Sequence, residues 1–389
     1  MDFDLAGHVR LHASLDVGRS LEAIGAEMDP YAGVAGGEGA GGDGKTPEVV
    51  LTHVRSDAPQ LEELQLAAVD GLVTGVAGGD LYLLAGGLRA RVPDALGDQP
   101  ARIEFDPGFP MRRLFRHVVR PALQLRSLAG GSVACHAAAV ERDGRAILVA
   151  GWSESGKTET ALALVEAGAH FLTDKWTLLG FPEDAPDATG LSAAAFPISV
   201  GVRRWVLRYL PRLSGSLPRR ARGRLMAAGA AAVLSAPIRG RDRLRGFPAI
   251  LRDGAERAVA IADRVGLSPS EIATAYGHSP IRDRVPVGLV VVLRTVPGIR
   301  PSARPADPRR TSRRLAASAV TERQAYLALR QRAAYAAGSD PAAPSAARLE
   351  ADRLETMLAN VPIVEVSAPF PADPRMVVEA LAPWLTGTP

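Results

Sequence analysis

The sequence predicts an α/β fold in which a smaller β-rich N-terminal domain precedes a larger α/β domain. Short apolar runs separated by glycine turns fill the first 130 residues. From residue 146 an apolar strand, a glycine loop, an amphipathic helix and a second strand follow in order. The length of 389 residues suits two domains better than one. We therefore expect domains at residues 1–130 and 131–389.

Most of the N-terminal domain is predicted to be short strands. Val9, Leu11, Ala13 and Leu15 alternate with polar residues, as in a half-buried strand. Further strands are expected at residues 49–52, 72–76, 81–84, 88–92 and 101–105.

Glycines mark the ends of these elements. Gly78-Gly79-Asp80 and Gly86-Gly87 are typical of hairpin turns. Residues 31–45 are rich in glycine and lack periodicity, which predicts a mobile loop. Residues 111–128 predict a helix that is interrupted or restarted at Pro121. This helix ends at Gly130-Gly131, which is the expected domain boundary.

The second domain alternates strands with helices. Strands are expected at residues 136–140, 146–150, 170–173, 177–179, 287–293 and 363–366. Helices are expected at residues 157–167, 321–336, 347–358 and 374–381. Gly168 is expected to be the left-handed cap of the first of these helices. Residues 297–310, rich in proline and arginine, and residues 338–345, a linker of small residues, are expected to be excursions on the surface.

A basic helical insertion is expected around residues 200–250. Residues 203–245 hold twelve arginines and a single acid, Asp242. Solvated helix faces, a surface for an acidic substrate or partner, and a contact with membrane or nucleic acid are the three interpretations. No interleaved aromatic residues or nucleic-acid motif support the last of them.

The bulk composition favours a soluble, cytoplasmic chain. Apolar residues make up 47% of the sequence, enough for a packed core. The longest apolar runs, such as residues 289–293, are far too short to span a membrane. The first residues are acidic and do not resemble a signal peptide. The lone Cys135 excludes an internal disulfide and fits a reducing compartment.

Lysine is rare in this chain. Of 46 basic residues only Lys45, Lys157 and Lys175 are lysines, and the arginine bias fits genome composition. A lysine in such a chain can mark a site that needs a compact ammonium and that a guanidinium would not fit. Lys157 and Lys175 both fall in the segment that carries the motif described next.

Residues 151–158 form a phosphate-binding loop motif. The run Gly151, Trp152, Ser153, Glu154, Ser155, Gly156, Lys157, Thr158 satisfies the pattern G-x-x-x-x-G-K-[ST]. The glycines allow a tight turn whose N–H groups face phosphate oxygens. Lys157 can reach the β- and γ-phosphates, and Thr158 offers a hydroxyl to Mg²⁺. An apolar strand precedes the loop and an amphipathic helix follows it, so the sequence predicts an ATP site with Mg²⁺.

The similarity extends beyond the loop. Residues 151–174 read G-W-S-E-S-G-K-T-E-T-A-L-A-L-V-E-A-G-A-H-F-L-T-D and resemble the catalytic domain of HPr kinase/phosphorylase. That family has K-[ST]-E-T-A-L-x-L after the loop, then a glycine that ends the helix and a strand that ends in two aspartates. It also places a histidine in an H-G-x-x-V-type segment before the loop. Here His136 stands fifteen residues before Gly151, at the family's spacing.

The resemblance covers residues 135–176 and implies an ATP-dependent kinase whose core is similar to that of PEP carboxykinase. It implies a metal role for Asp174 and Thr158. The chain departs from the family at one position, because Lys175 stands where the family has its second aspartate, the general base. An ammonium there cannot accept a proton from an attacking hydroxyl unless its pKa is strongly lowered. Lys175 is therefore expected to neutralise phosphate charge, or to pair with Asp174 or Glu159.

Two interpretations are open for each of three further residues. His136 has either a catalytic or orienting role or is a core histidine. Glu159 is either an acid favoured by the helix dipole or an indirect partner of the metal. Trp152 is either a lid over the nucleotide or a packing residue.

The first hypothesis is a kinase that transfers phosphate from MgATP to a hydroxyl of a peptide, protein or small molecule. The acceptor's proton would go to Asp174, His136 or an acid not yet identified. The second is a nucleotide-binding sensor or scaffold that has lost catalysis at position 175. A GTPase switch is disfavoured, because the three lysines cannot form an Asn-Lys-x-Asp element. The sequence leaves open a homo-oligomer and does not name the acceptor.

Overall fold

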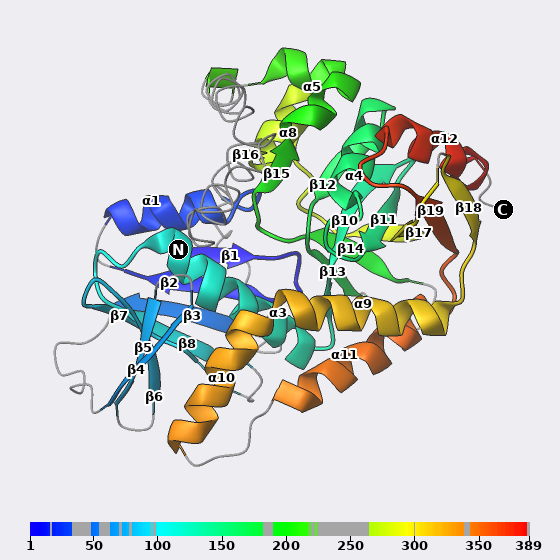
Figure 1. Cartoon of the computed structure of the whole chain (residues 1–389). Helices are drawn as coiled ribbons and strands as arrows, with labels where there is room; N and C mark the ends of the chain where they lie inside the picture. The colour runs from blue at the N-terminus through cyan, green and yellow to red at the C-terminus, as the bar shows by residue number, and fades with distance from the viewer. Residues whose placement is uncertain are drawn as a thin grey trace, which may run out of the picture.

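The computed structural model of the chain has a mixed α/β fold built around two large sheets (Figure 1). It describes residues 1–15, 18–32, 48–53, 63–69, 72–77, 80–93, 95, 99–181, 190–217, 219, 222–223, 264–298, 300–337 and 343–386. The first sheet is formed by residues 2–105 and the second by residues 133–368. The expected α/β class is therefore confirmed.

Eight strands form the first sheet. In spatial order they are β1 (Asp2–Asp4), β2 (Arg10–Ser14), β3 (Glu48–His53), β8 (Ala101–Phe105), β7 (Leu88–Arg91), β6 (Asp80–Ala85), β5 (Leu72–Ala77) and β4 (Glu63–Val69). β3 is parallel to β2 and to β8, and the remaining pairs are antiparallel. Gly86 and Gly87 both have positive φ, as the hairpin turn between β6 and β7 requires.

Most strands expected in this part of the chain are confirmed, but three of the described elements were not predicted. They are β1, α1 (Gly18–Glu27) and β4. The glycine-rich stretch expected as a loop lies almost wholly outside the described residues, as do Gly78 and Gly79.

The helix expected near residues 111–128 is one run with a wider turn in its middle. It consists of α2 (Met111–Leu114), a π-helical turn (Phe115–Val119) and α3 (Arg120–Ala129). Pro121 lies in the first turn of α3. Because proline has no N–H to donate, the preceding turn widens instead of breaking the helix.

The second sheet has nine strands. Seven follow the spatial order β12 (His170–Thr173), β10 (Ala137–Arg142), β11 (Arg145–Gly151), β17 (Val285–Thr295), β14 (Ser192–Ala195), β13 (Thr177–Gly180) and β9 (Val133–Cys135). The other two are β19 (Ile363–Ala368), which pairs with β17, and β18 (Ser302–Pro305), which pairs with β19. β11, β17 and β19 run parallel to one another, so their carboxyl ends lie at one edge.

Helices cover both faces of the second sheet (Figure 1). α4 (Lys157–Glu166) and α12 (Pro374–Leu385) lie on one face, and α9 (Pro308–Glu322) and α11 (Ala343–Leu358) lie on the other. Alternate side chains of β11 point to the two faces of the sheet, and both faces are apolar. Ile147 and Val149 pack in the cluster that holds α4, whereas Leu148 and Ala150 pack in the cluster that holds α9. Gly168 ends α4 with φ +106°, and the N–H of Ala169 donates to Leu164, so the expected cap is confirmed.

The remaining described elements lie beside α4. They are β15 (Val200–Arg203), a 3₁₀ turn (Arg204–Tyr209), α5 (Pro211–Ser216), β16 (Arg264–Leu267) and α8 (Pro269–Ala275). β15 and β16 form a small antiparallel sheet of their own. Residues 224–263, which include much of the expected basic insertion, lie outside the described residues.

The helix expected at residues 321–336 is confirmed as α10 (Gln324–Ala337), but the helix before it, α9, which ends at Glu322, was not predicted. The stretch at residues 297–310 lies on the surface as expected, and it also contains β18 and the start of α9. Asp307 caps α9 through its carboxylate and Pro308 takes the first helical position, a combination that begins a helix. Residues 338–342 lie outside the described residues.

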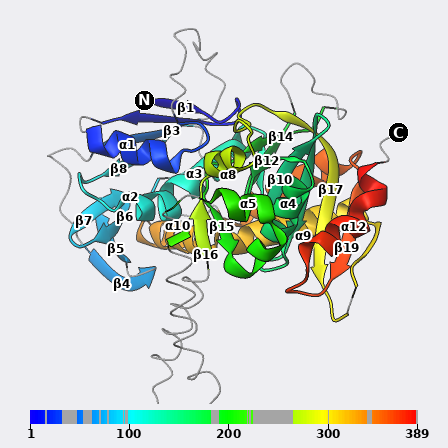
Figure 2. The ribbon, with the colours of Figure 1, turned by 90° about the horizontal axis from the view of Figure 1, so that it is seen from above.

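α3 lies between the two sheets and packs against β3 on one side and β9 on the other (Figure 2). One hydrophobic cluster includes Leu11 and Ile103 of the first sheet together with Leu148 and Val290 of the second. The division expected at residue 130 falls between the end of α3 and the start of β9. Among the described residues no helix is long and apolar enough to cross a membrane.

A buried polar contact also links the sheets. His8 shares a hydrogen bond of 2.7 Å with Ser132, and burial lowers the pKa of His8 to about 3, so its ring is neutral. A Cβ atom at Gly180 would lie 2.7 Å from His8 and 2.8 Å from Ser132.

Gly180→Ala should therefore lower the free energy of unfolding by about 1–3 kcal/mol, because neither neighbour can withdraw from this buried contact. Gly266→Ala, on β16 with no atom within 4 Å of the added methyl, is the matched control and should be nearly neutral. Chemical denaturation of both variants measures the difference. Equal stabilities would show that the contact between His8 and Ser132 is loose.

Candidate functional site

The candidate site is the sharp turn between β11 and α4. Gly151 ends β11 with φ +152°, and a Cβ there would lie 2.9 Å from the carbonyl oxygen of Leu293. Gly156 precedes α4 with φ +92°, and Glu154 between them also has positive φ, +62°. The loop needs glycine at both ends, as the sequence motif requires.

The inside of the loop is rich in hydrogen-bond donors. The Lys157 ammonium donates to the carbonyls of Gly151 at 3.0 Å and Trp152 at 2.8 Å. Burial lowers the pKa of Lys157 to about 8. The first N–H groups of α4 have no acceptor within the helix, and no side chain caps them. Ser155 Oγ is buried and has no partner among the described residues. An anion in the loop would satisfy all of these groups.

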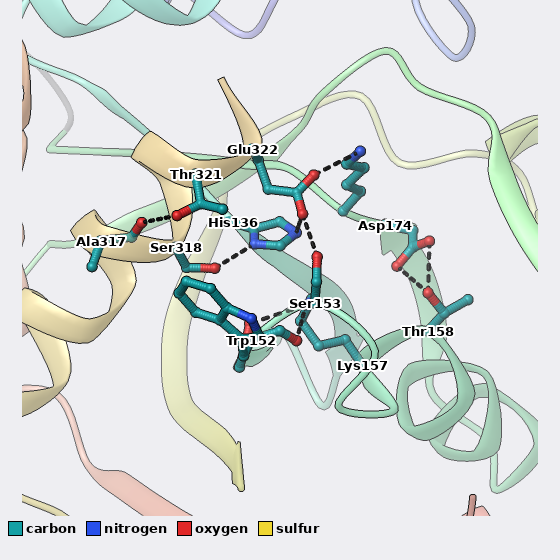
Figure 3. Close-up of polar contacts among 12 residues, drawn as sticks. His136, Trp152, Ser153, Lys157, Thr158, Asp174, Ala317, Ser318, Thr321 and Glu322 are labelled. Atoms are coloured by element: carbon teal, nitrogen blue, oxygen red, sulfur yellow. Dashed lines mark hydrogen bonds and ion pairs between the residues drawn. The ribbon is translucent and has the colours of Figure 1, made fainter. Parts of the chain in front are cut away.

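Thr158 and Asp174 meet at the start of α4. The Thr158 hydroxyl lies 3.0 and 2.9 Å from the two carboxylate oxygens of Asp174 (Figure 3). Asp174 is buried, and its burial raises the pKa of the carboxyl, while Thr158 and the nearby lysines oppose that rise. The sheet explains the meeting: the ends of β11 and β12 and the start of β10 lie at the same edge.

Lys175 follows Asp174 in a strained turn. Its φ is +64°, and the N–H of Trp176 donates to the carbonyl of Asp174 at 2.7 Å across it. A left-handed backbone is costly for any residue other than glycine, and such strain is frequent at functional sites. The turn sends the Lys175 ammonium to Glu322, at 2.9 Å, and not to Asp174 or Glu159.

Glu322, the last residue of α9, is the site residue that the sequence did not reveal. It accepts hydrogen bonds from Ser153 and Lys175, and its Oε1 lies 3.8 Å from Nε2 of His136 (Figure 3). Burial alone would raise its pKa, but Lys175, Ser153 and His136 together lower it to about 2. Glu322 is therefore an ionised carboxylate that contacts the loop through Ser153.

His136 lies in the short link between β9 and β10. It is buried, and Nδ1 shares a hydrogen bond of 2.7 Å with Ser318 of α9. Burial and the charge of Lys157 lower its pKa to about 3, so the ring is neutral at physiological pH. Its contacts connect α9 to the loop, and both the orienting role and that of a satisfied core histidine stay predictions.

Two arginines lie against the outer side of the loop. Arg203 donates to Glu154 at 2.9 Å and lies 3.6 Å from Glu159, and Arg264 lies 3.4 Å from Glu154. Glu159 is buried, which raises its pKa, and Arg203 opposes that rise. The arginine-rich stretch thus begins at the site, although Arg220, Arg224 and later members lie outside the described residues.

Trp152 is not a packing residue. Its exposed fraction is 56%, whereas most large apolar side chains are covered. The alternative of a lid over a bound nucleotide stays a prediction.

The structure brings together every residue expected at the site, and it adds Glu322 and Arg203. No motif in the sequence marks either addition. One signal could have revealed Glu322. Asp307-Pro308 is typical of a helix start, and a helix of about four turns from there ends at Glu322. Comparison of the sequence with models of protein families gives no match, and comparison with curated proteins gives none either.

Proposed function

We propose that the chain is an ATP-dependent phosphotransferase that transfers the γ-phosphoryl group to a hydroxyl of a peptide, protein or small molecule. One observation supports this most strongly: Lys157, Thr158 and Asp174 converge at the uncapped start of α4. A loop of backbone donors, a lysine, a hydroxyl and a carboxylate are the components that phosphoryl transfer requires. In this reaction the protein mainly positions the reactants and stabilises the charge of the transition state.

The residues present fit Mg²⁺. Thr158 and Asp174 offer oxygen atoms side by side, and Mg²⁺ takes its remaining ligands from phosphates and water. A buried carboxylate with a raised pKa, such as that of Asp174, is stabilised in its ionised form by a bound cation. The ion would neutralise charge on the β- and γ-phosphates. Lys157 would leave the carbonyls of Gly151 and Trp152 and bind the same phosphates.

Calorimetric titration with ATP, in the presence and absence of Mg²⁺, tests the nucleotide site. Turnover is then measured with water as the acceptor and with a library of hydroxyl-containing peptides. We expect Mg²⁺-dependent ATP binding together with slow hydrolysis. A chain that binds no nucleotide at millimolar concentration would contradict the proposal.

The second candidate is a nucleotide-binding sensor without catalysis. It is favoured by one observation, the ammonium at position 175 that pairs with Glu322. ATP binding without turnover towards any acceptor would support it. Lys175→Asp would not separate the two candidates, because the new carboxylate would face Glu322 and repel it.

Trp152 gives a direct optical test of nucleotide binding. Because its indole is exposed on the loop, MgATP should change the intrinsic fluorescence of the protein. Trp152→Phe should remove most of that change while keeping ATP affinity within about threefold in calorimetry, since a flat apolar ring remains. Trp176 is buried beside His136 in the same site, so its fluorescence is the next that nucleotide binding could change. A signal that persists in Trp152→Phe would assign it to another tryptophan.

A further inference from the structure

Transfer to a hydroxyl needs a group that takes the hydroxyl's proton. Four carboxylates lie at the described loop, and all four have partners. Asp174 is the proposed metal ligand, and Glu159 and Glu154 pair with Arg203. Glu322 pairs with Lys175, and it differs from the other three in approaching the loop from α9 and in accepting a hydrogen bond from the loop hydroxyl of Ser153.

Glu322 already binds a hydroxyl group. Ser153 Oγ donates to its carboxylate in this structure (Figure 3). Ser153 directly follows Trp152, whose carbonyl receives the Lys157 ammonium. Because that ammonium is the group that reaches the γ-phosphate in loops of this kind, Glu322 lies beside the place where the γ-phosphate would be.

We infer that Glu322 binds the hydroxyl of the phosphoryl acceptor and takes its proton, and that the Ser153 hydroxyl marks where the acceptor hydroxyl binds. This inference rests on the proposed function, which it deepens by naming the acceptor site. The acceptor is an alcohol that approaches between the end of α9 and the loop.

The acceptor oxygen forms a bond to the γ-phosphorus, and the bond between that phosphorus and the β–γ bridging oxygen breaks, leaving ADP. The acceptor proton moves to a carboxylate oxygen of Glu322, which later releases it to water. No group is oxidised or reduced.

The surroundings of Glu322 fix its position, and an acceptor hydroxyl that took the place of Ser153 would remove one of the contacts that lower the pKa of Glu322. Its side chain is 16% exposed, so it is shielded yet reachable. Lys175 holds one oxygen, Oε2, at 2.9 Å, and Ser153 and His136 lie at the other, Oε1. His136 is in turn held by Ser318 of the same helix. A hydroxyl that displaced Ser153 would therefore meet a carboxylate whose position is already set.

Glu322→Gln preserves the shape of the side chain but removes its basicity. With ATP as donor and water as acceptor, we expect turnover to fall by roughly 100-fold or more. The dissociation constant for MgATP should stay within about threefold of wild type, so the loss falls on kcat and not on binding. Glu355→Gln is the matched control, because Glu355 pairs with Arg309 on the surface, and it should leave both quantities unchanged.

Two further variants keep the test decisive. Glu322→Asp retains the charge on a side chain one methylene shorter and should give an intermediate rate. This variant also serves as the test if Glu322→Gln does not fold. Glu322→Ala leaves space for a small carboxylate, so formate should restore part of its lost turnover. A residue that only held the loop together would show neither effect.

The outcomes separate the inference from the proposed function. A Glu322→Gln variant that turns over ATP like wild type overturns the inference and leaves the proposed function standing. A parallel loss of MgATP affinity in Glu322→Gln and Glu322→Ala also overturns it, because Glu322 would then only hold Ser153 and the loop. A wild-type chain that binds MgATP without any turnover removes the proposed function, and the inference with it.

Discussion

Asp174→Asn should nearly eliminate phosphoryl transfer, with a fall in turnover of about 1000-fold or more. Asparagine keeps the shape of the side chain and its hydrogen bond with Thr158 but removes the charge that the metal needs. MgATP affinity should fall as well, whereas binding of ATP without Mg²⁺ should change little. Calorimetry at several Mg²⁺ concentrations, together with an ATP turnover assay, measures both effects.

Stability gives an independent check on Asp174→Asn. Burial raises the pKa of Asp174, so its ionised form is costly in the folded state without a cation. The neutral variant should therefore unfold at the same temperature as wild type or higher. Asp143→Asn, an exposed change in the turn between β10 and β11, is the control for the substitution itself. A variant that retains full turnover would show that Asp174 does not serve the metal.

Lys157→Ala should weaken MgATP binding by about 100-fold or more, because the loop then holds the phosphates with backbone N–H groups alone. The ammonium donates only to two carbonyls in this structure, so the fold should survive its loss. Lys157→Arg should also bind MgATP poorly, since the larger planar guanidinium cannot take the place of a compact ammonium beside phosphates held inside the loop.

Lys175→Ala is the matched lysine control. It removes an ammonium that pairs with Glu322 outside the loop, so MgATP affinity should remain within about threefold while turnover falls. Circular dichroism and thermal unfolding of each variant exclude misfolding. Unchanged MgATP affinity in Lys157→Ala would remove the basis of the nucleotide site.

Local chemistry explains what could be predicted from the sequence. The phosphate loop, the cap at Gly168 and the turn at Gly86-Gly87 depend on residues close together in the chain, so their patterns are visible in a single sequence. β14 was not predicted, because its Ser-Ala-Ala-Ala sequence has little strand propensity and becomes a strand only through its pairing with β13 and β17.

The same distinction, between residues close together in the chain and residues brought together by the fold, explains which site residues could be predicted. Residues 151–159 and 174–175 lie in one short stretch and were predicted together. Glu322 is 169 residues away from Ser153, and Arg203 is 49 residues away from Glu154, so only the sheet topology brings them to the loop. The proline- and arginine-rich stretch before Glu322 was interpreted as surface loop, which hid the cap of α9 at Asp307.

The junction between α9 and α10 connects the first sheet to the loop by direct contacts. Tyr326 lies one helical turn beyond Glu322, and its hydroxyl donates at 2.9 Å to the carbonyl of Pro93, which follows β7. Between them, Arg323 forms a buried ion pair with Glu350 of α11, so the junction is held from both sides. Any partner that displaces Pro93 would therefore alter the free energy of the arrangement at Glu322. Because such coupling is reciprocal, nucleotide binding would change the affinity for that partner by the same factor.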